Sequence, residues 1–186
     1  MSGDRRLAHG PAEDDDEVLL DAARSGDAEA FRKLWVPVER RAFALCFHLT
    51  GNRADALDAL QETQIAVWRN LNRFEGRSAF SVWVLAIARN AARALIRRRP
   101  ATVDLLFPEA DEAAGAGIAF DETVVAMVDL RRALASLDAS HREALLLWAG
   151  GLSYEETAAV LQVPLNTVKV WIFRARKGLR ERLGRP

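Results

Sequence analysis

Apolar residues recur at three- and four-residue steps through most of the chain, which is the spacing of amphipathic helices. In the N-terminal half this pattern predicts helices over residues 19–25, 28–41, 41–49, 54–70 and 79–99. Gly26 and Gly51 mark breaks between them, and Asp27 and Asp55 suit the first turns of the helices that follow. No stretch keeps the period-two alternation of a strand. The sequence therefore predicts an all-α protein.

Residues 152–183 predict two short helices joined by a tight turn, a helix-turn-helix of the kind that binds DNA. Ser153 and Glu156 have the spacing of a capping box at the start of the first helix, predicted over residues 153–161. Pro164 ends that helix, and Asn166 can cap the next. The stripes expected to face the core are Tyr154, Ala158 and Leu161 in the first helix, and Val168, Ile172, Ala175, Leu179 and Leu183 in the second.

The opposite face of the second helix combines cations with apolar side chains. Projection at 100° per residue places there Val170, Phe173, Arg174, Lys177 and Arg180, with Lys169 and Arg176 beside them. A solvated helix has little reason to expose an aromatic ring between arginines. A major-groove helix uses such a ring against thymine methyls, and arginine against guanine edges or phosphates. The alternative is a charged surface helix with one stray aromatic.

The helix predicted over residues 79–99 carries a second candidate nucleic-acid face. Its buried stripe is predicted to be Phe80, Val84, Ile87, Ala91 and Leu95, and its flank Trp83, Ala86, Asn90, Arg93 and Arg97, with Arg89 behind. An indole can stack on an unpaired base, asparagine can read a base edge, and arginines hold phosphates, which suits single-stranded nucleic acid. In the preceding loop Phe74 could flank an extruded base. Trp83 and Phe74 could equally be core aromatics, and the residues alone leave both interpretations open.

The charge is segregated along the chain, although its formal net value is zero. Residues 89–99 contain five arginines and no acid, residues 100–130 contain seven acids and no Lys or Arg, and from Arg142 onward bases outnumber acids eight to four. Pro100, Pro108 and the Gly-containing stretch 113–117 argue against a packed helix in the acidic segment. This pattern indicates two nucleic-acid-facing modules joined by an acidic linker.

Other features bound the class of protein. No apolar run approaches the roughly 20 residues that a membrane span needs, and the start shows no signal peptide, so a cytoplasmic protein without membrane insertion is expected. Cys46 stands alone among apolar neighbours and is predicted to be a buried small hydrophobe. Because His9, His48 and His141 are scattered and no metal-ligand spacing or phosphate-binding glycine loop appears, no catalytic residue, metal or cofactor is expected.

Three stretches carry a resemblance to a known family: residues 58–63 (DALQET), 74–90 (FEGRSAF through W to IARN) and 152–176 (LSYEE through TVK to RAR). Together they resemble the extracytoplasmic-function (ECF) sigma factors of the sigma-70 superfamily, small bacterial initiation factors with two helical domains. The resemblance implies binding to core RNA polymerase, at the clamp of the beta-prime subunit and at the beta flap, and to promoter DNA. It also implies an anti-sigma factor that restrains the protein.

The acidic start of the chain is expected to be a disordered tail over 1–17. The resemblance divides the rest into sigma region 2 over 18–99, a linker over 100–121 and sigma region 4 over 122–186. It implies that region 2 opens and reads the −10 element and that region 4 reads the −35 element as duplex. A one-component repressor or activator that binds a palindrome as a dimer is the alternative. That alternative explains neither the flank of the helix over 79–99 that suits single-stranded nucleic acid nor the acidic linker.

The implied contacts, combined with the projections, give three sets of site residues. For core polymerase they are Asp58, Leu60, Gln61 and Glu62; for the −10 element Phe74, Arg77, Ser78, Trp83, Arg89, Asn90, Arg93 and Arg97; and for the −35 element Lys169, Val170, Trp171, Phe173, Arg174, Arg176 and Lys177. Several positions depart from the family pattern. Ala59 and Gln64 replace larger apolar residues, and Gln162 replaces a turn glycine, at a cost on the order of 1 kcal/mol if that residue is left-handed.

Overall fold

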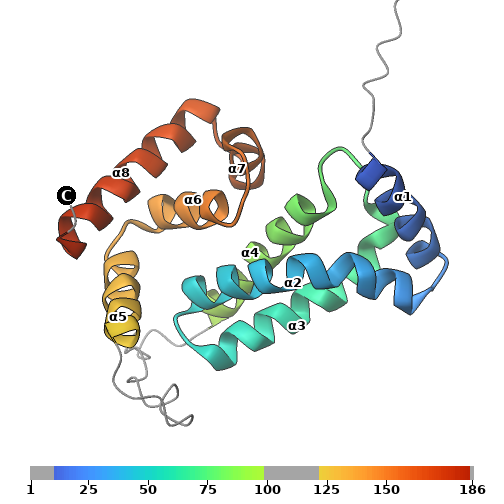
Figure 1. Cartoon of the computed structure of the whole chain (residues 1–186), viewed down its shortest axis with the longest axis horizontal. Helices are drawn as coiled ribbons and strands as arrows, with labels where there is room; N and C mark the ends of the chain where they lie inside the picture. Colours follow the sequence, from blue (N-terminus) through green and yellow to red (C-terminus); the bar gives the residue numbers. More distant parts are fainter. Residues whose placement is uncertain (1–10, 99–121, 185–186) are drawn as a thin grey trace, which may run out of the picture.

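The computed structural model describes residues 11–98 and 122–184, and this part of the chain is helical, with no strand (Figure 1). The helices are α1 (Pro11–Arg24), α2 (Ala28–Thr50), α3 (Arg53–Asn70), the short 3-10 helix η1 (Leu71–Arg73), α4 (Phe80–Arg98), α5 (Glu122–Ala135), α6 (Ala139–Ala149), α7 (Tyr154–Leu161) and α8 (Leu165–Leu183). The prediction of an all-α protein is confirmed. The predicted linker over 100–121 and residues 1–10 of the predicted tail lie outside the described residues.

Helices α2, α3 and α4 pack against one another, and α1 packs on α2 to form the N-terminal bundle. Small residues allow the helices to approach closely, since Ala42, Ala59, Ala88 and Ala92 are all fully buried. Cys46 is buried among them as predicted, and desolvation raises the pKa of its thiol to about 12, so that it stays protonated.

Helix ends in this bundle follow the local signals. The Asp27 side chain accepts hydrogen bonds from two amides at the start of α2, and Gly51 ends that helix in the left-handed conformation, at φ 82°. Asn52 caps α3, which places Asp55 in its first turn. The predicted division into helices 28–41 and 41–49 is wrong, because the buried stripe that contains Val38 and Ala42 runs through this point without a break.

The C-terminal bundle packs α8 against α5, α6 and α7. Val168, Ile172 and Ala175 are buried as predicted, and the capping box between Ser153 and Glu156 is present at the start of α7. The Ser153 hydroxyl accepts from the Glu156 amide at 3.1 Å, and the Glu156 carboxylate accepts from the Ser153 amide at 2.7 Å. These contacts fix the start of α7, the first helix of the helix-turn-helix.

Three local predictions need correction. Residue 164 rather than Asn166 is the N-cap of α8, and no side chain caps this end; the Pro164 carbonyl instead accepts from the Thr167 amide at 2.9 Å. Residues 11–17, predicted as part of a tail, lie in α1. The buried face of α4 is rotated from the predicted one: Phe80 and Val84 are buried, but Val82, Leu85, Ala88 and Ala92 complete the face, while Ile87, Ala91 and Leu95 are only partly buried.

Candidate nucleic-acid interface

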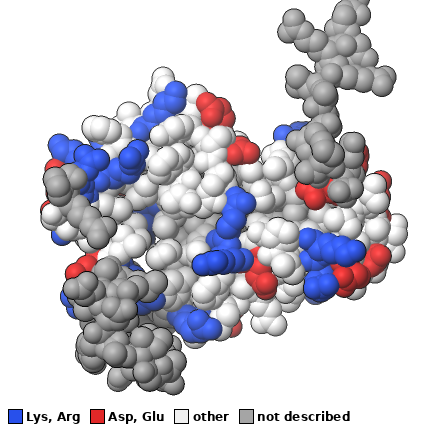
Figure 2. Space-filling view, in the orientation of Figure 1, with Lys and Arg blue, Asp and Glu red and all other residues white. Residues whose placement is uncertain are grey.

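The outer face of α8 presents apolar side chains between cations. Phe173 is 68% exposed and Val170 is 44% exposed. Arg174 and Lys177 are exposed beside them. Figure 2 shows the Lys and Arg side chains gathered over this helix, at the upper left. This face can offer a ring to a thymine methyl and guanidinium groups to base edges or phosphates.

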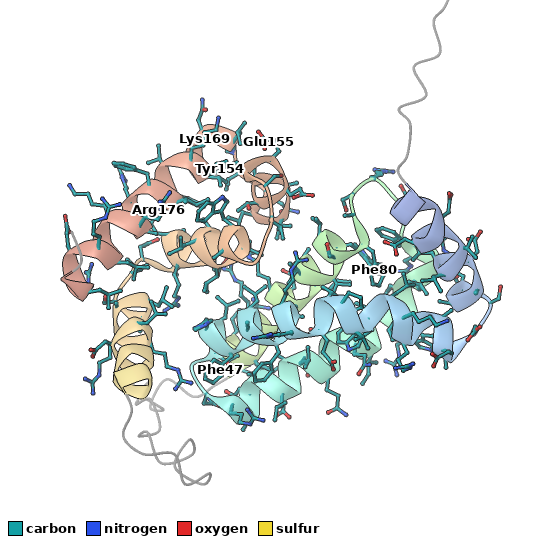
Figure 3. All side chains as sticks on the ribbon, viewed as in Figure 1. Phe47, Phe80, Tyr154, Glu155, Lys169 and Arg176 are labelled. Atoms are coloured by element: carbon teal, nitrogen blue, oxygen red, sulfur yellow. The ribbon has the colours of Figure 1, made fainter. Side chains whose placement is uncertain are left out.

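Two of the predicted α8 residues are engaged by the protein itself. The Arg176 guanidinium lies 5.3 Å from the centre of the Trp148 ring, which in turn stacks on Tyr154 (Figure 3). Trp171 is half-buried, with its ring 6.1 Å from that of His141. Both side chains therefore brace α8 against α6, whereas Lys169 lies exposed at the start of the helix.

The turn before α8 sets the direction in which that helix leaves. Gln162 ends α7 in the left-handed conformation, at φ 57°, and its amide and that of Val163 return to carbonyls of α7. This confirms that the residue in the place of the usual glycine is left-handed. A residue with a Cβ is strained there, at a cost of about 1 kcal/mol.

The second predicted face lies along α4. Asn90, Arg93 and Arg97 are exposed, as an interface with nucleic acid requires. Trp83 is half-buried, since one side of its indole packs on Phe74 and Phe80. The structure thus brings the predicted indole, amide and guanidinium groups onto one flank of a single helix.

The loop before α4 departs from the prediction at Phe74. This ring is 5% exposed and contacts Phe80 edge-on at 5.7 Å between ring centres, so it belongs to the core and is not free to flank a base. The physical reason is that three aromatic rings, including that of Trp83, bury their apolar area together. Arg77 and Ser78 remain exposed.

Arg24 of α1 fixes the base of this loop. Its guanidinium donates to the carbonyl oxygens of Leu71, at 3.5 Å, and Phe74, at 2.5 Å, and pairs with Asp21 at 2.9 Å. Between α1 and the loop lies an open groove of about 370 Å³, whose lining includes Arg24, Glu75 and Ser78. The sequence patterns gave no sign of Arg24, because its two acceptors are backbone atoms 47 and 50 residues away.

Arg89 differs from its neighbours on α4. Its guanidinium Nε donates to the Glu143 carboxylate at 2.6 Å, and the two side chains are only 14% and 10% exposed. Arg93 approaches the same carboxylate at 3.4 Å. Glu143 belongs to α6, so the pair joins the two bundles.

The predicted polymerase surface on α3 is exposed in part. Asp58, Gln61 and Glu62 are exposed, while Leu60 is partly buried against the core. Beside them the structure places three exposed apolar residues that the sequence analysis missed, namely Leu57, Ile65 and Trp68, at 45%, 43% and 40% exposure. A helical projection centred on the small buried residues of α3 would have placed Ile65 opposite them and Leu57 and Trp68 at the sides of the outer face, where the Trp68 ring also meets Phe31 of α2 at 4.9 Å between ring centres.

Within residues 11–98 and 122–184, no group of three or more His, Cys, Asp or Glu side chains is placed to hold a metal ion. No helix in the same part of the chain is long and apolar enough to cross a membrane.

Comparison with known proteins gives matches in both bundles. Residues 34–102 match the Sigma-70 region 2 family and residues 127–179 match the Sigma-70, region 4 family. The ECF RNA polymerase sigma-E factor of Escherichia coli K12 is 35% identical over 176 residues, which cover 88% of this chain and 92% of that protein. The RNA polymerase sigma-H factor of Pseudomonas aeruginosa is 31% identical over 179 residues, covering 90% and 93%.

Two solved structures have a similar fold. CnrH, solved in complex with the cytosolic domain of CnrY, has a TM-score of 0.71 and 27% identity, and covers 91% of this chain and 97% of its own. The sigma factor RpoE of Bartonella quintana, solved with the anti-sigma factor NepR, has a TM-score of 0.68 and 26% identity, and covers 85% and 99%. The similarity thus spans both bundles in the same order.

Proposed function

The chain belongs to the ECF family of sigma-70 factors, and on this premise we propose that it binds core RNA polymerase and directs it to specific promoters. The N-terminal bundle would read the −10 element as a melted strand, and the C-terminal bundle would read the −35 element as duplex. Such a factor acts in the cytoplasm, where the polymerase works, and supplies recognition rather than a catalytic group.

The outer face of α8 is the observation that carries the proposal. Phe173, at 68% exposure, gains nothing for folding by its position between cations, whereas in a major groove it would cover apolar base atoms. Arg174, adjacent to it, is exposed and can reach a base edge. Lys177 lies one turn further on and is suited to a phosphate.

The flank of α4 supports the −10 assignment. Asn90 is exposed two turns after the half-buried Trp83 on the same helix, so one unpaired base could stack on the indole while the amide reads the edge of a neighbouring base. Arg93 and Arg97 follow on the same flank and suit the phosphates of that strand. With Phe74 in the core, Trp83 is the aromatic group that remains for a base.

Helix α3 suits the polymerase. Leu57, Ile65 and Trp68 expose apolar area on its outer face, bordered by Asp58 and Glu62. Exposed apolar residues grouped in this way and edged by charge are typical of protein–protein contacts. We assign this face to the beta-prime clamp and the C-terminal bundle to the beta flap.

We also propose that an anti-sigma factor restrains the protein. The support is that the similar sigma factor RpoE was solved in complex with the anti-sigma factor NepR, and that the similar CnrH was also solved with a bound protein, the cytosolic domain of CnrY. The acidic linker over 100–121 is proposed to cross the polymerase between the two promoter-reading bundles.

Run-off transcription with core polymerase tests the function. On fragments of DNA from its own genome, adding the protein should give discrete transcripts that core enzyme alone does not make. Ile65→Asp and Val18→Asp form a matched pair, because each places one charge at an exposed apolar position, and only the first lies on α3. The first should abolish the transcripts and the second should keep them. Transcripts that do not depend on the protein would contradict the proposal.

A further inference from the structure

The two helical bundles are joined by an ion pair that is almost removed from water. Glu143 of α6 accepts a hydrogen bond from the Arg89 Nε at 2.6 Å, and Arg93 Nη1 lies 3.4 Å from the same carboxylate oxygen. The side chains of Arg89 and Glu143 are 14% and 10% exposed, so this is an internal contact rather than a surface pair. One carboxylate of the C-terminal bundle thus engages two arginines of the N-terminal bundle.

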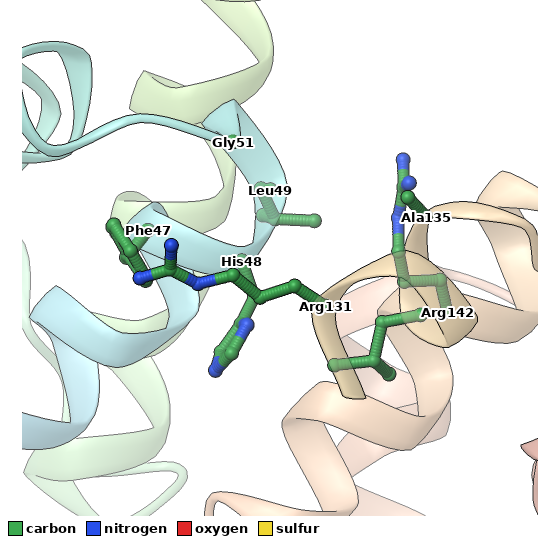
Figure 4. Close-up of a pocket in the computed structure, with 8 residues that line it drawn as sticks. Phe47, His48, Leu49, Gly51, Arg131, Ala135 and Arg142 are labelled. Atoms are coloured by element: carbon green, nitrogen blue, oxygen red, sulfur yellow. The ribbon is translucent and has the colours of Figure 1, made fainter. Parts of the chain in front are cut away.

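A second contact holds the same two bundles together. The Arg131 guanidinium of α5 reaches across to lie 4.2 Å from the centre of the Phe47 ring, on α2, next to His48 (Figure 4). These residues line a cavity of about 30 Å³ together with Leu49 and Arg142. The cavity is too small for more than a water or two, so the bundles are in close contact here.

Arginine groups are imperfectly satisfied near this interface. The Nε atoms of Arg41 and Arg142 are buried without a hydrogen-bond partner within the described residues. Burial also lowers the pKa of Arg131, because its charged form loses solvation. The unsatisfied Nε atoms and the lost solvation of Arg131 reduce the net free energy that holds the two bundles together. These arginines regain their hydration when the bundles separate.

We propose that Glu143 is an intramolecular competitor for DNA, which occupies Arg89 and Arg93 while the two bundles are closed on each other. The inference rests on the proposed function, since it requires that these arginines contact DNA phosphates. A carboxylate in the place of a phosphate offers the same charge and the same acceptor atoms to a guanidinium. The free protein therefore binds single-stranded DNA weakly, and opening of the bundles exposes Arg89 and releases the already exposed Arg93 from the carboxylate.

The pair is suited to a reversible contact. The attraction between Glu143 and Arg89 is offset by the desolvation of both groups, so closure has a small net free energy. Removal of the carboxylate alone leaves the Arg89 charge buried and unpaired in the closed state, which disfavours that state strongly. Glu143→Gln should therefore shift the population toward open molecules.

Two measurements on the full-length free protein test this mechanism. Fluorescence anisotropy with a labelled 20-nucleotide oligothymidine gives affinity and its salt dependence, and small-angle X-ray scattering gives the radius of gyration. Glu143→Gln should raise the affinity about three- to tenfold and increase the radius of gyration. The slope of log affinity against log salt should steepen by roughly one unit, because about 0.7 of a counterion is released for each phosphate bound to a single strand.

Glu155→Gln is the matched control, since it removes the same charge from an exposed position on α7 and touches neither arginine. It should change affinity less than twofold and leave the radius of gyration unchanged. Arg131→Ala is a second route to opening that leaves Glu143 in place. It removes a cation, so a simple charge effect would weaken DNA binding, whereas release of the contact with Phe47 should strengthen it.

The two measurements separate a failure of the competitor mechanism from a failure of the −10 assignment. If Glu143→Gln and Arg131→Ala both leave the radius of gyration and the affinity at the values of the parent protein, Glu143 holds nothing closed and the inference is wrong. If the bundles open without any gain in affinity, Arg89 and Arg93 do not bind nucleic acid, and the −10 assignment of the proposed function fails with the inference. An increase in the radius of gyration together with a gain in DNA affinity supports both the competitor mechanism and the −10 assignment.

Discussion

Replacement of Phe173 by alanine should weaken promoter discrimination without harming the fold. The residue is 68% exposed, so the truncation removes little buried area from the protein. Full burial of a phenylalanine side chain contributes about 1.5–3 kcal/mol, and covering the exposed two-thirds in a groove is therefore worth roughly 1–2 kcal/mol. That corresponds to an affinity loss of about 5- to 30-fold at a site where the ring meets a thymine methyl.

Promoter selection from a library randomised at the −35 element measures this effect. Holoenzyme with Phe173→Ala should lose preference at one thymine, and Arg174→Ala should relax preference at a neighbouring base pair, at about 1–3 kcal/mol. Lys177→Ala on the same helix is the control: it should weaken all sequences alike and reduce the salt slope by about one unit. An unchanged base preference for both Phe173→Ala and Arg174→Ala would refute the orientation of α8 assumed here.

Three further outcomes are expected. Asn90→Ala should reduce the permanganate reactivity of promoter thymines in open complexes far more than it reduces binding in closed complexes. The reason is that stacking and reading of unpaired bases contribute roughly 1–3 kcal/mol per base. Equal reactivity in the variant and the parent would mean that Asn90 has a purely structural role. Gln162→Gly should raise the free energy of unfolding by about 1 kcal/mol in urea denaturation, since φ is 57° there; a destabilised variant would contradict this. Burial, and then the Arg131 charge, lower the pKa of His48 in the folded protein. As pH drops below about 6.5 the unfolded chain therefore takes up a proton before the folded protein does, and the free energy of unfolding should fall. Parallel profiles of this free energy against pH for the parent and His48→Gln would contradict this.

Local signals predicted much of the fold. The Ser153–Glu156 capping box, the Asp27 cap and the buried stripe of α8 were all readable, because each depends on residues within one or two turns of each other. The tail prediction was wrong over residues 11–17, since a run of acids near the start resembles a solvated segment although it lies in α1.

The site residues that were predicted incorrectly make contacts with segments far away in the sequence. Phe74 was assigned to DNA through the family resemblance of its loop, but rings from α4 enclose it. Arg89 was placed behind the exposed flank and assigned to DNA through the resemblance, and its pairing with Glu143 was not predicted because the two residues are 54 positions apart. A helical projection locates the face on which a side chain lies, but it does not show which other helix covers that face. For this reason it could not predict the pairing across the two bundles.

Promoter recognition by this chain is proposed to depend on the polymerase, and footprinting with and without core enzyme tests this dependence most directly. The two promoter-reading bundles lie on either side of the acidic segment over 100–121, and the enzyme is proposed to hold them at promoter spacing. On a promoter found by run-off transcription, the protein with core enzyme should protect both the −35 and −10 elements, and the protein alone should protect neither at the same concentration. Protection of a palindromic site at nanomolar concentration by the protein alone would contradict the account and favour a dimeric repressor.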